Sequence, residues 1–138
     1  MKRNIAVLLV SMVFFSGSIY ANESEAIAQA QSAAESWLKL TDTGAYKQSW
    51  SDAASIFKQS ISQANWAKAV RQARSPLGPM SSRVLKNSTY TRTLPGAPEG
   101  EYVVFQYETR FENRVGIETV TPMREEDGGW RVSGYFVR

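Results

Sequence analysis

The sequence predicts an α+β domain in which three N-terminal helices pack on one face of a curved four-stranded antiparallel sheet. Residues 23–74 are rich in alanine and repeat their apolar side chains at helical spacing. Residues 83–138 are rich in β-branched and aromatic residues, and they end in a strand–turn–strand pattern centred on Asp127-Gly128-Gly129. Helices followed by an antiparallel meander are typical of the α+β class.

The chain begins with the pattern of a secretory signal peptide. Lys2 and Arg3 precede the apolar run Ile5–Phe15, and the small residue Ala21 then offers a cleavage site. The apolar run is about half of the roughly 20 residues that a membrane span requires. We therefore expect residues 1–21 to be removed on export. The protein is then periplasmic or secreted, and it contacts a membrane only while this segment is uncleaved.

The remaining residues, 22–138, are long enough for a single domain with its own hydrophobic core. Two of the 16 lysines and arginines lie in the signal segment, which leaves 14 basic residues against 13 acidic ones. This balance argues against a nucleic-acid partner. The chain has no histidine and no cysteine, which excludes a Ser-His-Asp triad, a cysteine nucleophile and an ordinary zinc site. We expect no cofactor and no bound metal, although oxygen ligands alone can hold a hard cation.

Three helices are predicted before the first strand. The first spans Glu23–Leu40, and the turn-forming residues Asp42-Thr43-Gly44 end it. The second spans Ala45–Lys58. The third begins after Ser62, a good N-cap residue, and it ends at Arg74 before a segment rich in proline and glycine.

Aromatic side chains line the predicted interface between the helices and the sheet. Because an apolar cavity with a few polar groups is the usual small-ligand site, they are the candidate ligand-binding residues. The alternative is that they fill the core, since aromatic residues bury large areas. The candidates are Trp37, Trp50, Phe57, Trp66, Tyr107 and Phe136.

Four strands are predicted in the second half of the chain. The first is Arg83–Leu94, and the turn-rich loop Pro95–Gly100 follows it. The second strand is Glu101–Phe111, whose apolar residues alternate clearly. The third and fourth strands form the hairpin on either side of the glycine turn.

The pairing register decides which side chains face the helices. A three-residue loop, Glu112-Asn113-Arg114, gives the second and third strands a consistent apolar face. This register directs Trp130, Val132 and Phe136 toward the core. It directs Glu118 and Tyr135 to the outer face.

The same register places Glu108 directly opposite Glu118, with their Cβ atoms about 5 Å apart. One interpretation is a general acid/base pair, with Tyr107 and Tyr135 as further candidate catalytic residues. A second is a cation site completed by Gln106. A third is a solvated face on which arginines neutralise both carboxylates. A fourth is a homodimer interface, because the outer face also carries apolar side chains.

Three segments resemble a known family: WLKLTDTGAYKQSW, TLPGAPEGEYVVFQYETRF and ETVTPMREEDGGWRVSGYFVR. They look like small exported bacterial proteins grouped as domain of unknown function 4019, and the resemblance extends over essentially all of residues 22–138. The order of helices and strands also resembles the cystatin-like or nuclear-transport-factor-2-like architecture, which hosts both enzymes and non-catalytic modules. The family itself implies no activity and no catalytic residue.

These observations favour an exported non-catalytic domain that binds a small ligand or an envelope protein partner. The alternative is an acid/base enzyme of the isomerase or lyase type that uses carboxylates and tyrosines. A third hypothesis is an envelope interaction protein, acting as an inhibitor through the outer sheet face or through the loop at residues 94–100.

Overall fold

We analysed a computed structural model of the chain, which describes residues 18–138, with side chains from Asn22 onward. The apolar run of the predicted signal peptide lies outside the described residues. Within the described range, no helix is both long enough and apolar enough to cross a membrane.

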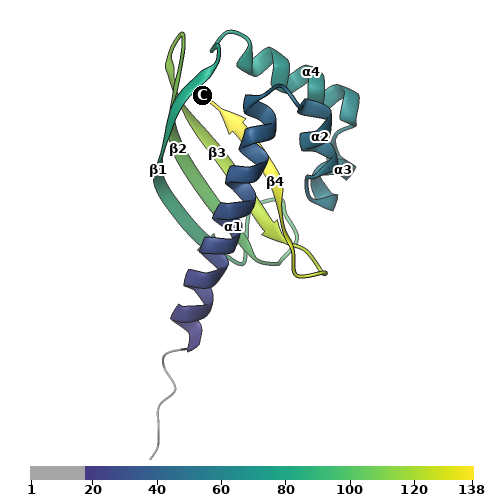
Figure 1. Cartoon of the computed structure of the whole chain (residues 1–138). Helices are drawn as coiled ribbons and strands as arrows, with labels where there is room; N and C mark the ends of the chain where they lie inside the picture. The colour runs from purple at the N-terminus through teal and green to yellow at the C-terminus, as the bar shows by residue number, and fades with distance from the viewer. Residues whose placement is uncertain (1–17) are drawn as a thin grey trace, which may run out of the picture.

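Four helices precede an antiparallel sheet of four strands in the order β1-β2-β3-β4 (Figure 1). The helices are α1 (Ser18–Asp42), α2 (Tyr46–Ser51), α3 (Ser55–Ser60) and α4 (Gln63–Arg74). The strands are β1 (Met80–Thr91), β2 (Tyr102–Phe111), β3 (Val115–Arg124) and β4 (Trp130–Val137). The predicted α+β class and the antiparallel four-stranded sheet are confirmed.

The predicted second helix, Ala45–Lys58, is instead the two short helices α2 and α3. The chain leaves helical geometry between them because the Ala54 N–H donates to the Val132 carbonyl at the edge of β4, at 2.8 Å. Ala53 and Ala54 are completely buried at this contact. The predicted start of α4 is confirmed, since the Ser62 side chain accepts a hydrogen bond from a backbone N–H of the first turn.

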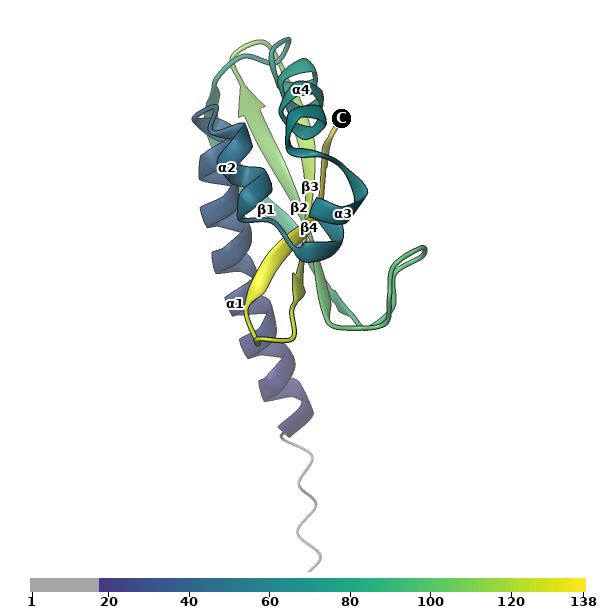
Figure 2. The ribbon, with the colours of Figure 1, turned by 90° about the vertical axis from the view of Figure 1, so that its right-hand side faces the viewer.

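The core lies between the helices and the sheet. α1 runs diagonally across the strands, while α2, α3 and α4 gather beside it (Figure 1). Figure 2 shows the β1–β2 loop bending away on the side of the sheet opposite α1. The core combines apolar side chains from α1, α3, α4, β2, β3 and β4, among them Ala34, Leu38, Phe57, Val70, Phe105, Val120 and Val132. The apolar set of β2 faces this core, as predicted.

The register between β2 and β3 differs by one residue from the prediction. Val115 pairs with Arg110 rather than with Phe111. Phe111 still belongs to β2 and pairs with Met80 of β1, but it has no partner in β3, so four residues, 111–114, separate the last paired residues of β2 and β3. A slip of one residue exchanges the two faces of a strand. Glu118 and Val120 therefore face the helices, and both are completely buried.

The β3–β4 hairpin is confirmed, but a bulge near Thr121 shifts its register. Such an extra residue lets Val132 and Tyr135 point to the same side although they lie three positions apart. Trp130 and Val132 contact the core as predicted. The predictions for their neighbours are wrong, because Tyr135 points inward while Phe136 is 54% exposed on the outer face.

Candidate functional site

The carboxylate of Glu118 is completely buried on the helix-covered side of the sheet. Arg83 donates from Nε to Oε1 at 2.8 Å, and its Nη2 lies 2.8 Å from the same oxygen. The Thr109 hydroxyl also donates to Oε1, and the Tyr135 hydroxyl donates to Oε2 at 2.5 Å. Arg74 Nη1 lies 3.8 Å from Oε2. Both carboxylate oxygens are therefore engaged.

Asp42, the last residue of α1, links the two arginines. Its Oδ1 accepts from Arg74 at 2.8 Å and from Arg83 at 2.9 Å, and its Oδ2 accepts from Arg83 at 2.8 Å. Burial opposes ionisation of this carboxyl, but the hydrogen bonds from Arg83 and Arg74 outweigh it and lower the pKa of Asp42. We call Asp42, Arg74, Arg83 and Glu118 the ionic cluster. Its two positive and two negative charges balance.

Two tyrosines beside the ionic cluster hold their protons strongly. Burial and the adjacent Glu118 carboxylate raise the pKa of Tyr135. Burial, followed by the charge of Glu35, raises the pKa of Tyr107 to about 12. Among the described residues, the buried Tyr107 hydroxyl has no hydrogen-bond partner. Neither tyrosine is therefore suited to accept a proton at neutral pH.

The predicted pairing of Glu108 with Glu118 is wrong. Glu108 lies opposite Ile117 and Glu118 lies opposite Tyr107, so the two carboxylates point to different faces. On the outer face Glu108 is instead 3.9 Å from the Lys86 amino group. The geometry thus removes both the acid/base pair and the shared cation site. Over residues 18–138 we find no group of three or more side chains suited to hold a metal ion.

Most of the candidate ligand-binding rings pack against one another. The Trp37 and Trp66 rings are 5.9 Å apart, and Phe57 contacts Trp66 edge-on at 4.8 Å. Trp37 donates its N–H to the Ser49 carbonyl at 2.7 Å, and Trp66 donates to the Ser49 hydroxyl at 2.9 Å. The Trp50 N–H also donates to a backbone carbonyl, at 2.8 Å. These rings fill the core with their polar atoms satisfied.

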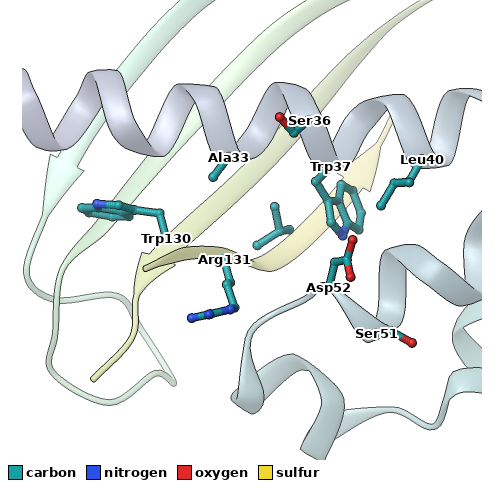
Figure 3. A pocket seen from close by; sticks show the side chains of 9 residues that line it. Ala33, Ser36, Trp37, Leu40, Ser51, Asp52, Trp130 and Arg131 are labelled. Atoms are coloured by element: carbon teal, nitrogen blue, oxygen red, sulfur yellow. The ribbon is translucent and has the colours of Figure 1, made fainter. Parts of the chain in front are cut away.

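A groove of about 410 Å³ opens between α1 and the first residues of β4 (Figure 3). Trp37 and Trp130 stand at its two ends, and Asp52 and Arg131 contribute charged groups from the opposite side to α1. Within the described part of the chain, the buried Trp130 Nε1–H has no partner. The groove is lined by Ala33, Ser36, Trp37, Leu40, Ser51, Asp52, Trp130, Arg131 and Val132.

The sequence pattern predicts Trp37 as a ligand-binding candidate and Trp130 as a core residue alone. Trp130 does pack against the core, yet it also forms a groove wall. The alternation of residues along β4 does not distinguish a ring that only packs in the core from one that also lines a groove. The ionic cluster has no sequence signal either, because its members come from α1, α4, β1 and β3.

The fold and the buried charges define a small α+β domain with an ionic cluster between helices and sheet. A family model described as protein of unknown function (DUF4019) matches residues 33–135. The match covers most of the chain, so the protein belongs to this family, in agreement with the resemblance of the three segments. It includes all four residues of the ionic cluster and the whole lining of the groove. No curated protein matches the chain.

Proposed function

We propose that the protein is an exported, non-catalytic module that binds a small ligand in the groove between α1 and β4. The observation that carries this proposal is Trp130, which lines the groove and whose buried N–H has no partner among the described residues. An unsatisfied buried donor costs about 1–3 kcal/mol, and a ligand acceptor would recover that free energy. Two indole rings with a few polar groups are also the usual lining of a small-ligand site.

Three further observations support the proposal. Both oxygens of Glu118 are occupied, so the best-placed buried carboxylate is not free to act as a base. The basic and apolar N-terminal segment supports export, and a periplasmic or secreted location belongs to the proposal. A helix lying across an antiparallel meander is what a cystatin-like or nuclear-transport-factor-2-like binding module requires (Figure 1).

Nuclear magnetic resonance of the ¹⁵N-labelled protein tests this function with a library of small carboxylates, amides and heteroaromatic acceptors. We expect some of these probes to shift the Trp130 indole resonance saturably. Ser36→Leu should abolish the shift because the larger side chain fills the groove. Ser24→Leu, on an exposed position of α1 outside the groove, is the matched control and should leave it unchanged. An indole resonance that no probe moves, in a folded protein, contradicts the proposal.

A further inference from the structure

We infer that the outer face of the sheet is the interface of a symmetric homodimer. This face lies on the side away from the core and from the groove, so the inference does not depend on the proposed ligand. Its main side chains are Val84, Glu108, Arg110, Val115, Ile117 and Phe136.

The exposed apolar side chains of the protein are concentrated on this face. Val84, Val115 and Phe136 are 55%, 46% and 54% exposed, and they are all the large apolar side chains that are exposed in the described range. The strand pairing places all three on the outer face. The Thr119 hydroxyl, on β3 opposite Phe136, is buried without a partner in that same range. Apolar residues gathered on one surface indicate association, whereas scattered ones do not.

The face is large enough for a dimer. Four strands of about ten residues cover roughly 19 Å by 33 Å, from the usual spacing between strands and rise per residue. Two such faces would bury at most about 1,200 Å² in total, the lower limit of stable interfaces. The β1–β2 loop already covers Tyr102 at one end of the face, so the free area corresponds to a weak dimer. Open antiparallel sheets commonly pack face to face in this way.

The charges on the face complement themselves. Glu108 and Arg110 lie two residues apart on β2 and point to the same outer side. A two-fold axis between them would bring the carboxylate of each copy opposite the guanidinium of the other, and this contact occurs twice. The Glu108 carboxylate is free to make it, because its nearest cation in the described chain, Lys86, is 3.9 Å away and 53% exposed. A second copy is thus the occupant that fits both the apolar and the charged parts of the face.

Analytical ultracentrifugation of the purified protein tests this inference. We expect a dimer at high micromolar concentration, and we expect Phe136→Asp and Glu108→Arg each to give a folded monomer. Combining Glu108→Arg with Arg110→Glu should restore the dimer, because the exchange preserves the complementarity across the two-fold axis. Ala69→Asp, an exposed position on α4, adds a charge elsewhere and should leave the mass unchanged.

Circular dichroism and urea unfolding would establish that each variant is folded. A native protein that stays monomeric at millimolar concentration overturns the inference. So does a Phe136→Asp variant that still dimerises. Failure of the double charge exchange to restore the dimer, when both single variants are folded, overturns the two-fold arrangement that the inference specifies.

Discussion

The two faces of the sheet differ in an unexpected way: charged side chains lie on the face that the helices cover, and exposed apolar side chains lie on the other. The helix-covered face holds Glu118 and Arg83 together with the aromatic core, whereas the outer face exposes Val84, Val115 and Phe136. The reason is that a buried charge is tolerated where it is paired and hydrogen-bonded. The apolar pattern of a strand therefore predicts which of its faces turns toward the helices only when its polar residues have no charged or hydrogen-bonding partner on that side.

The largest expected effect comes from Glu118→Gln. The neutral amide would leave the buried Arg74 and the largely buried Arg83 with one carboxylate, which typically costs about 3–5 kcal/mol of the free energy of unfolding. Urea denaturation measures this loss. Glu108→Gln is the matched control on the outer face, and its effect should remain within about 0.5 kcal/mol when unfolding is measured at a protein concentration too low for the inferred dimer to form. Equal losses of unfolding free energy in the two variants would contradict the difference between the two faces.

A smaller effect is expected for Asp42→Asn, about 1.5–3 kcal/mol, because hydrogen bonds to charged groups are lost. The lowered pKa of Asp42 also makes this stability depend on pH. Its contribution is fully present above the unfolded value of about 3.9 and is lost as the pH falls through the lower folded value. Unfolding measured between neutral and acidic pH should thus show a shallower acid decline in the variant.

Asp127 is the exposed counterpart for that experiment. The hydrogen bonds from Arg131 and from the Gly129 N–H lower its pKa to about 2. Because solvent screens this ion pair in the hairpin turn, Asp127→Asn should change the stability very little. A large loss in this variant would show that the turn, and not burial, governs the acid stability.

Among the substitutions at and beside the ionic cluster, the smallest effect is expected for Tyr135→Phe, about 1–2 kcal/mol, since Glu118 would lose one donor. The raised pKa of Tyr135 has a consequence at alkaline pH. Above about pH 10 the unfolded chain releases the tyrosine proton while the folded protein keeps it, so stability falls as the pH rises. Thermal unfolding at neutral and alkaline pH should therefore show a weaker alkaline decline in the variant.

Phe136→Leu is the control for this substitution, because Phe136 is the next residue in β4 and points to the outer face. It keeps an apolar side chain there and should change stability by no more than about 0.5 kcal/mol at a protein concentration too low for the inferred dimer to form. It should also leave the alkaline decline intact. If the two substitutions had the same alkaline profile, Tyr135 would not be the titrating group.

Local patterns in the sequence were enough to predict the fold class, the Ser62 cap, the hairpin and the inward face of β2. The side chains of β3 were assigned to the wrong faces because Val115 pairs with Arg110 and not with Phe111, the last residue of β2. Phe136 was misplaced because a bulge near Thr121 is invisible in an alternating pattern. Both errors have the same cause: a shift of one residue in the pairing moves the side chains of a strand to the opposite face of the sheet.

The candidate site was less accessible to sequence reasoning than the fold. The ionic cluster joins residues up to 76 positions apart, from Asp42 to Glu118, and no spacing rule connects them. The groove depends on how α1 crosses the start of β4, and only Trp37 of its two indoles belonged to the predicted ligand set. Long-range packing therefore determines which residues form the ionic cluster and the groove, and local periodicity does not predict them.

The hydrogen bond from Ala54 to Val132 has a consequence for how the sheet can grow. An edge strand offers unpaired backbone groups to other chains, which is a common route to polymerisation. The segment between α2 and α3 occupies part of the β4 edge. The opposite edge, β1, is interrupted by register irregularities on both sides of Arg83 and by the exposed charge of Lys86. Both edges of the sheet are therefore poor templates for pairing with a further strand, which keeps the sheet at four strands.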